Sequence, residues 1–266
     1  MSEEPFYRIV DESAGRYHAT TSTAGPWFAD AQHLGPPSAL LVRAFERCAP
    51  SRPDAPPLQL ARYTIEILGV VPVGDLEVRT WIERPGRTIE MLAAEMTAGG
   101  RTVLRARAWR LAIDDTSDAA VGAAATLPGP EAARPQGERP HGWLPGYLDA
   151  VEWRWLDGQW DDLGPGRAWG RLRVPVVEGE EATPLQGLAA IADSANGVAA
   201  TLRMQDWLFV NTELSVHLHR PPTGPWTGVD AATVIGPTGT GTVTAKLFDV
   251  TGHAAHITQE LTVRRR

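Results

Sequence analysis

The sequence predicts an α+β protein built from two similar halves, each with one long helix covered by an antiparallel sheet. Three observations carry this prediction. A low-complexity stretch divides the chain near its middle, the order of expected elements is the same on both sides, and each side has one long helix-forming run. Because a curved antiparallel sheet can bury one face against a single helix, each half can form a core.

The dividing stretch covers residues 114–142 and is rich in Ala, Pro and Gly, without apolar periodicity. This composition is typical of a linker that runs over the surface of a protein. We therefore expect an N-terminal half at residues 1–113, the linker at 114–142, and a C-terminal half at 143–266.

In the N-terminal half, a β-rich run at 16–25 precedes a helix expected over 33–49. Pro36 and Pro37 suit the first turn of this helix, where a backbone N–H is not needed. Four further β-rich runs follow, joined at glycine-containing turns, and they cover residues 58–70, 74–86, 88–100 and 101–113.

The C-terminal half repeats this order with a strand expected over 167–176 and a helix over 183–203. Thr183 is the expected N-cap of the helix, and Pro184 follows it. Four β-rich runs come next, at 208–220, 226–236, 240–252 and 253–265. A shift of about 150 residues aligns the two halves, which indicates duplication of a whole subdomain.

Composition and charge exclude several classes of function. The chain has 266 residues, 43% of them hydrophobic, and a net charge of −7, which argues against nucleic acid or an anionic membrane as the main partner. Cys48 is the only cysteine, and His217 and His219 have no third ligand nearby, so we expect no disulfide and no metal site. An acidic N-terminus and the lack of a long apolar run predict a cytoplasmic protein without a membrane span.

The stretch PLQGLAAIADSANGVAATL, residues 184–202, places one carboxylate, Asp193, among small and apolar residues. Aspartate is a poor helix former, and burial of its charge without partners costs several kcal/mol. Either an arginine or backbone donor satisfies Asp193 inside a dry core, or the carboxylate faces a site. The shifted alignment puts Val42 at the corresponding position, so the duplicated scaffold does not require an acid there.

Several strings in this order and spacing resemble the acyl-CoA thioesterase family of fused double hot-dog proteins, the TesB-like group. They are GPWFADAQHLGPPSALLVRAFE, TPLQGLAAIADSANG, LFVNTELSVHLHRPPTGPW, TGTG and AHITQEL. The resemblance implies a double hot-dog fold, in which two antiparallel sheets, each wrapped around a central helix, join into one continuous sheet. It also implies hydrolysis of acyl-CoA or related acyl thioesters to free acid and thiol, without a cofactor.

The resemblance also implies a set of site residues. In that family a carboxylate on the second helix, a polar residue on the following strand and a glutamine on the last strand hold the hydrolytic water. These positions match Asp193, either Asn211 or Thr212, and Gln259. Because neighbours on a strand face opposite sides, we expect only one of Asn211 and Thr212 to reach the site.

The substrate is expected to contact both helices. Pro36 and Pro37 have no N–H to offer, so an oxyanion contact before the first helix would come from Gly35 or Ser38. On the second helix, Asn196 and Gly197 lie near Asp193 at helical spacing and leave a narrow groove for an acyl chain or a pantetheine arm.

Two other functions fit the same scaffold. One is a non-catalytic protein that binds acyl-CoA or an acyl lipid. The other is an enoyl-CoA hydratase or dehydratase, for which Asp30 and His33 would supply a carboxylate and an imidazole, although their spacing does not favour it; His33 is otherwise a local hydrogen-bonding group. Exposed sheet edges and the fused, dimer-like unit predict a homodimer or a larger homo-oligomer.

Overall fold

The computed structural model describes residues 4–266, and the strands of this part of the chain form a 14-stranded sheet. The strand order is β1-β2-β4-β5-β6-β3-β11-β14-β13-β12-β9-β8-β7, and β10 also pairs with β14. Each named pair of strands is antiparallel. The two halves meet where β3 pairs with β11, so the expected continuous sheet is present.

The strands of the N-terminal half are β1 (Tyr7–Asp11), β2 (Arg16–Ala19), β3 (Leu58–Ile67), β4 (Asp75–Arg84), β5 (Ile89–Ala98) and β6 (Arg101–Ala112). The remaining strands are β7 (Arg134–Pro135), β8 (Val151–Asp157), β9 (Gly166–Leu172), β10 (Trp207–Asn211), β11 (Glu213–Leu218), β12 (Thr227–Ile235), β13 (Thr240–Asp249) and β14 (Gly252–Arg265). One strand was expected before each long helix, but β1 and β2 precede α1, and β7, β8 and β9 precede α2.

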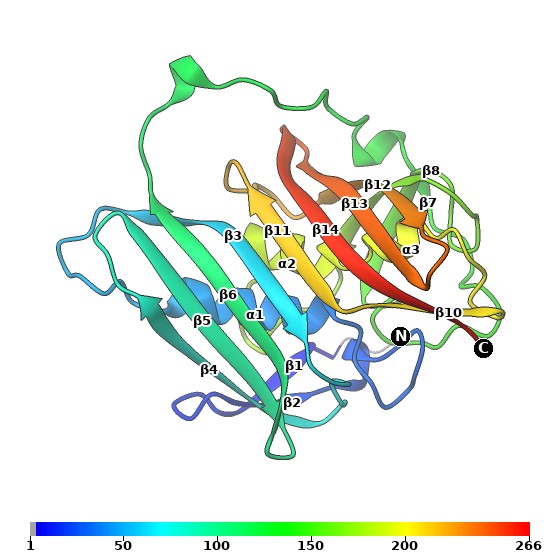
Figure 1. Ribbon diagram of the computed structural model, residues 1–266, viewed down its shortest axis with the longest axis horizontal. Coiled ribbons are helices and arrows are strands. Elements are labelled where there is room, and N and C mark those ends of the chain that lie inside the picture. The colour runs from blue at the N-terminus through cyan, green and yellow to red at the C-terminus, as the bar shows by residue number, and fades with distance from the viewer. Residues whose placement is uncertain (1–3) are drawn as a thin grey trace.

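The helices lie on one face of the sheet, and Figure 1 shows α1 and α2 behind the strands. They are α1 (Gly35–Arg47), α2 (Pro184–Ala192) and the short α3 (Ala195–Val198). Single 3-10 turns occur at Thr21–Thr23, Ser117–Ala119 and Pro130–Ala132. In the part of the chain described, no helix is both long and apolar enough to cross a bilayer.

Both long helices begin as their sequences predict. Prolines occupy the first turn of α1, and the Thr183 side chain accepts a hydrogen bond from the Gln186 N–H at the start of α2. The end of the second helix is different. The expected run over 183–203 stops at Ala192, with Asp193 as its C-cap, and resumes as one turn of α3.

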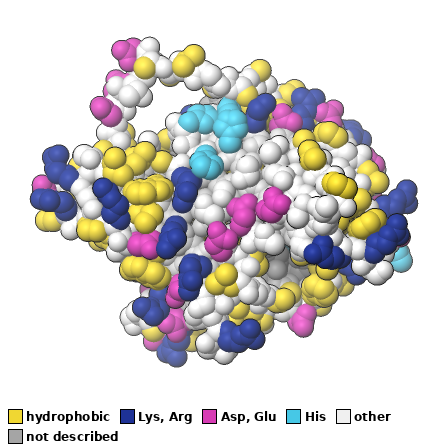
Figure 2. All heavy atoms as spheres, in the orientation of Figure 1, with side chains coloured by type: hydrophobic (Ala, Val, Ile, Leu, Met, Phe, Trp, Pro, Cys, Tyr) yellow, Lys and Arg dark blue, Asp and Glu magenta, His cyan; other side chains and the backbone are white. Residues whose placement is uncertain are grey.

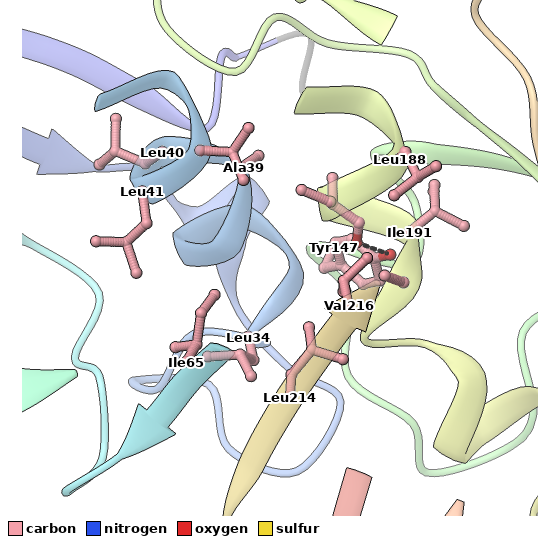
Figure 3. Close-up of a cluster of buried hydrophobic side chains, with 14 of the residues drawn as sticks. Leu34, Ala39, Leu40, Leu41, Ile65, Tyr147, Leu188, Ile191, Leu214 and Val216 are labelled. Carbon is pink, nitrogen blue, oxygen red and sulfur yellow. Dashed lines mark hydrogen bonds between the residues drawn. The ribbon is translucent and has the colours of Figure 1, made fainter. Parts of the chain in front are cut away.

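The main core lies between the two long helices and the strands where the halves join. Figure 3 shows α1 and α2 side by side, with Ala39 between them, above Ile65 of β3 and Leu214 and Val216 of β11. These three strand residues are 0% exposed and alternate with outward-facing polar residues along their strands. The apolar positions of β3 and β11 therefore face the core, and the polar positions between them face outward.

A buried arginine links α1 to the chain just before α2. Arg43 is 2% exposed, and its Nε and Nη2 donate to the two carboxylate oxygens of Glu180, each at 2.7 Å. Its Nη1 donates to the Tyr17 hydroxyl at 2.9 Å, and Nη2 also reaches Glu12. This bidentate pair fixes the first half against the second and neutralises the charge inside the protein.

The chain between β6 and β7 arches away from the sheet, as Figure 1 shows in green. Its later part returns to the C-terminal half, where the Ala124 N–H donates to His253 and Pro128 accepts from Trp169. The expected linker, 114–142, also contains β7, which pairs with β8 at the edge of the sheet. The domain boundaries that follow from this linker stay a prediction.

Candidate active site

Asp193 lies at the end of α2, where the helix stops and the chain turns into α3. Tyr147 stabilises this break, because its hydroxyl donates to the Ala190 carbonyl at 2.8 Å and contacts the Ser194 hydroxyl at 2.7 Å. Burial raises the pKa of Tyr147 above its ordinary value of 10, so the hydroxyl stays a donor. The helix break turns Asp193 from a mid-helix residue into a terminal one, and the poor helix propensity of aspartate favours this arrangement.

The Asp193 carboxylate is 6% exposed and is held by side-chain donors from three distant segments. Its Oδ1 accepts from Asn211 Nδ2 at 2.8 Å and from Gln259 Nε2 at 3.0 Å, while Oδ2 lies 3.0 Å from His33 Nδ1. Within residues 4–266, no lysine or arginine forms a salt bridge with it. The carboxylate is therefore hydrogen-bonded but not neutralised by a permanent cation.

The two candidates on the following strand occupy opposite faces, as expected from strand geometry. Asn211 ends β10 and points toward Asp193, while Thr212 is exposed and its hydroxyl donates to the Glu260 carbonyl at 3.3 Å. A break in the strand between β10 and β11 falls at Thr212. Asn211 thus joins the carboxylate, and Thr212 does not.

Gln259 reaches the carboxylate from the inner face of β14. It is 0% exposed, and its Nε2 donates to both the Asp193 backbone carbonyl, at 3.2 Å, and Oδ1. Its Oε1 is buried and finds no donor among the described residues. The reverse orientation of the amide would point Oε1 at two acceptor oxygens of Asp193, so the hydrogen-bond network determines which way the amide lies.

His33 was expected to bond locally, and the structure places it against Asp193, 160 positions away in the sequence. Its Nδ1 also lies 3.0 Å from the Gly35 N–H, a contact that requires an unprotonated Nδ1. The contact with Asp193 makes the opposite demand, because an ionised carboxylate repels the lone pair of an unprotonated nitrogen. With Asp193 ionised, the imidazole proton therefore lies on Nδ1, and the lone pair of Nε2 is free. Burial lowers the pKa of His33 below its ordinary 6.5, against the opposing effect of Asp193.

Gly35 makes this meeting possible, because it lets the start of α1 approach the end of α2. A Cβ at Gly35 would lie 2.3 Å from the Ala190 carbonyl oxygen, so no larger residue fits without moving a helix. Its N–H points at His33, and the Ser38 hydroxyl donates to the Leu34 carbonyl at 2.8 Å within α1. Neither Gly35 nor Ser38 lines the cavity, so the structure does not bring the expected oxyanion donors to the site.

The site opens into a cavity of about 600 Å³, within the size range of small-molecule sites. Asp193, Asn211 and His33 line it, as do Asn196 and Gly197, the two expected substrate contacts on the second helix. The wall is rich in apolar side chains, which include Trp27, Phe28, Trp143, Leu148, Trp160, Leu163, Leu202, Met204 and Phe209. Such a wall suits an acyl chain.

The imidazoles of the second half do not form a metal site. No group of His, Cys, Asp or Glu in residues 4–266 has the geometry to hold a metal ion. Asp30, the carboxylate that sequence proximity suggested as a partner for His33, is exposed, and the partner in the structure is Asp193.

Comparison with known families agrees with the fold and with the duplication. A family model described as the acyl-CoA thioesterase N-terminal domain matches residues 23–111, and one described as the C-terminal domain matches 130–263. The chain belongs to the acyl-CoA thioesterase family. No curated protein sequence matches it.

Several solved structures have the same fold as this chain. An acyl-CoA thioesterase II, TesB2, from Mycobacterium marinum has a TM-score of 0.63 at 14% identity, over 98% of this chain and 95% of the other. The tesB protein of Mycobacterium avium subspecies paratuberculosis has a TM-score of 0.67 at 14% identity, over 97% and 96%. A hot-dog protein of unknown function from Alicyclobacillus acidocaldarius reaches 0.71 at 14%, over 94% and 93%.

Proposed function

We propose that this thioesterase-family chain hydrolyses acyl-CoA or a related acyl thioester, with water activated at Asp193. The observation that carries the proposal is the position of this carboxylate, which is buried at the wall of an apolar cavity and held by two amides and an imidazole. Donors of this kind orient a carboxylate without removing its ability to accept a proton, as general base catalysis requires.

The proposed reaction needs no bound metal or cofactor. Water adds to the thioester carbonyl carbon as Asp193 takes one of its protons. Gln259 is buried and does not line the cavity, and it acts by holding Oδ1 of Asp193 through its Nε2. Collapse of the tetrahedral intermediate breaks the C–S bond. The departing thiolate receives the proton from Asp193, which leaves the free acid and the thiol.

Asn211 and His33 act as positioning residues in this proposal. Asn211 holds Oδ1, and the Nδ1–H of His33 holds Oδ2, so the remaining lone pairs of the carboxylate face a defined direction. Correct orientation of a water and its base can supply several kcal/mol of barrier reduction.

The test is release of free thiol from acyl-CoAs of graded chain length by the wild-type protein and by Asp193→Asn. We expect wild-type turnover with at least part of the series and a loss of about 100-fold in the variant. Asp161→Asn is the matched control, because Asp161 lines the same cavity with an exposed carboxylate and a positive φ that asparagine tolerates. Equal losses in both variants, or none in Asp193→Asn, would exclude the proposed role.

The contact between His33 and Asp193 favours a second candidate, the hydration of an enoyl thioester, because the free Nε2 could exchange a proton with substrate. Loss of enoyl absorbance without thiol release would identify that reaction. Tight binding of acyl-CoA with neither change would instead identify a binding protein.

A further inference from the structure

The outer face of the sheet, on the side away from the helices, carries charges sorted into rows across four neighbouring strands. Figure 2 looks onto this face and shows the histidines and the acidic side chains as separate groups with uncharged surface between them. One row is basic: Arg62, His217, His256 and Lys246 are successive cross-strand partners on β3, β11, β14 and β13.

The next row along the same strands consists of hydroxyl side chains. Thr64, Ser215, Thr258 and Thr244 are again successive partners across the four strands. Because side chains on one face recur every second residue, this row lies about 7 Å from the basic row.

The third row is acidic on three strands, with Glu66 opposite Glu213 and with the Glu260 N–H donating to the Glu213 side chain at 3.1 Å. Thr242 completes it on β13 and donates to Glu260 at 3.0 Å. The outer face of each of β3, β11 and β14 therefore carries a basic, a hydroxyl and an acidic side chain in succession.

Rows of like charge are unfavourable within a sheet, because directly opposite like charges repel. Burial, together with Glu66 and Glu260, raises the pKa of Glu213, while burial, His219, Lys246 and His217 lower that of His256. Within residues 4–266, none of the charged side chains in the basic and acidic rows forms a salt bridge, and Arg62 Nε is buried without a partner. On the neighbouring β6, by contrast, Arg105 and Arg107 each pair with a glutamate of the same chain.

We propose that this face binds the same face of a second copy of the chain, through a two-fold axis that runs along the hydroxyl row. Such an axis keeps each strand over its own counterpart and reverses its direction. It therefore sets Arg62 over Glu66, His217 over Glu213 and His256 over Glu260 of the other copy, and the same contacts recur by symmetry. Arg62, His217 and His256 of one copy each meet a glutamate of the other, while Lys246 meets Thr242.

The surface around the rows adds apolar contact. Val234 of β12 is 71% exposed and is the cross-strand partner of Thr242, so it faces the same way. A contact of two patterned sheets would thus have a charged centre with an apolar flank, and the charges would fix the register and direction of the two copies.

The proposal is tested by two charge-reversed variants measured alone and mixed. One carries Glu66→Lys with Glu260→Lys, and the other carries Arg62→Glu with His256→Glu. All four positions lie on the outer face, away from the catalytic cavity, so thioesterase activity and far-UV circular dichroism should match the wild type in each. Oligomeric state is read by sedimentation velocity, and native mass spectrometry separates mixed from like pairs.

We expect a wild-type dimer, and for each variant alone a dissociation constant raised at least about 100-fold, because like rows then face each other. An equimolar mixture should form a mixed dimer. In it the reversed row of one variant faces the reversed row of the other, the two unchanged rows also face each other, and both contacts join opposite charges. A monomeric wild type, a variant that still dimerises alone, or a mixture that stays monomeric each overturns the proposal.

Salt provides a measurement that needs no substitution. Raising ionic strength from about 0.05 M to about 0.5 M shortens the screening length, so the wild-type dimer should dissociate about tenfold more readily. A dissociation constant that does not respond to salt would place the interface elsewhere on the protein and reject the proposal.

Discussion

The two halves treat a buried charge in opposite ways. Arg43 of α1 is 2% exposed and donates hydrogen bonds to Glu180, Glu12 and the Tyr17 hydroxyl. Asp193 at the end of α2 is 6% exposed and is held by two amides and an imidazole. The arginine faces counter-charges, and the aspartate faces a cavity. A neutralised buried charge stabilises a fold, whereas one that is oriented but not neutralised can still accept a proton.

The largest expected effect tests the structural side of this comparison. Arg43→Met should lower the free energy of unfolding by about 3 kcal/mol, because Glu180 and Glu12 lose their buried partner. Urea denaturation measures the loss, and turnover per folded molecule should stay unchanged. Arg47→Met is the control, since Arg47 shares both carboxylates but is 51% exposed and should cost less than about 1 kcal/mol.

The catalytic side should show the reverse pattern. Asp193→Asn should reduce thiol release about 100-fold, yet change the free energy of unfolding by less than about 1 kcal/mol. The new amide keeps an oxygen for Asn211 and Gln259, and its N–H can donate to His33 once the imidazole proton moves to Nε2. A loss of stability as large as that of Arg43→Met would show that Asp193, like Arg43, mainly stabilises the fold, and would contradict the difference between the two buried charges.

The pH profile sharpens the comparison at His33. Its pKa is lowered by burial, so the folded protein binds this proton less readily than the unfolded chain, whose histidine titrates near 6.5. Stability contributed by the neutral ring is therefore present above that pH and falls as the solution is acidified. Activity should be constant above about pH 7 and decline below it, through an apparent pKa under 6.5.

His33→Gln retains a side-chain amide near Asp193 but cannot titrate. We expect turnover reduced about tenfold at pH 7 and the acid decline shifted or lost. An unchanged profile would assign the decline to another group.

The smallest effect separates two neighbours on one strand. Asn211→Ala should lower turnover about tenfold by freeing one side of the carboxylate, and Thr212→Val should change it less than about twofold. Both variants are measured with the same acyl-CoA. A larger effect at Thr212 would contradict the assignment of faces.

Much of the fold follows from the sequence, because apolar alternation and helical runs report directly which side of each element is buried. The start of α2 at Pro184 and the pairing of the halves into one sheet agree with the structure. The eight β-rich runs after the helices are strands, although the run at 208–220 is divided at Thr212 into β10 and β11. The strands β1, β7 and β8 were not expected, and β1 and β7 have only five and two residues, so their local signal is weak.

The candidate site was predictable in part. Asp193, Gln259 and Asn211 lie within hydrogen-bonding distance, as the family resemblance implied, and their catalytic roles stay proposals. His33 was expected to form a local hydrogen bond, with Asp30 offered only in the hydratase alternative, and the contact with Asp193 depends on how closely two helices cross. That crossing is set by Gly35 against the Ala190 carbonyl, a tertiary contact with no local pattern.

β14 serves two surfaces with consecutive residues, since Gln259 faces inward and Glu260 faces outward. Insertion of one residue within β14 before this point would turn Gln259 to the outer face and put Thr258 in its place beside Asp193. Insertion of two residues would restore the alternation. We therefore expect homologous chains to vary in length ahead of this strand by even steps, or to absorb an odd one in a bulge such as that between Leu247 and Phe248 of β13.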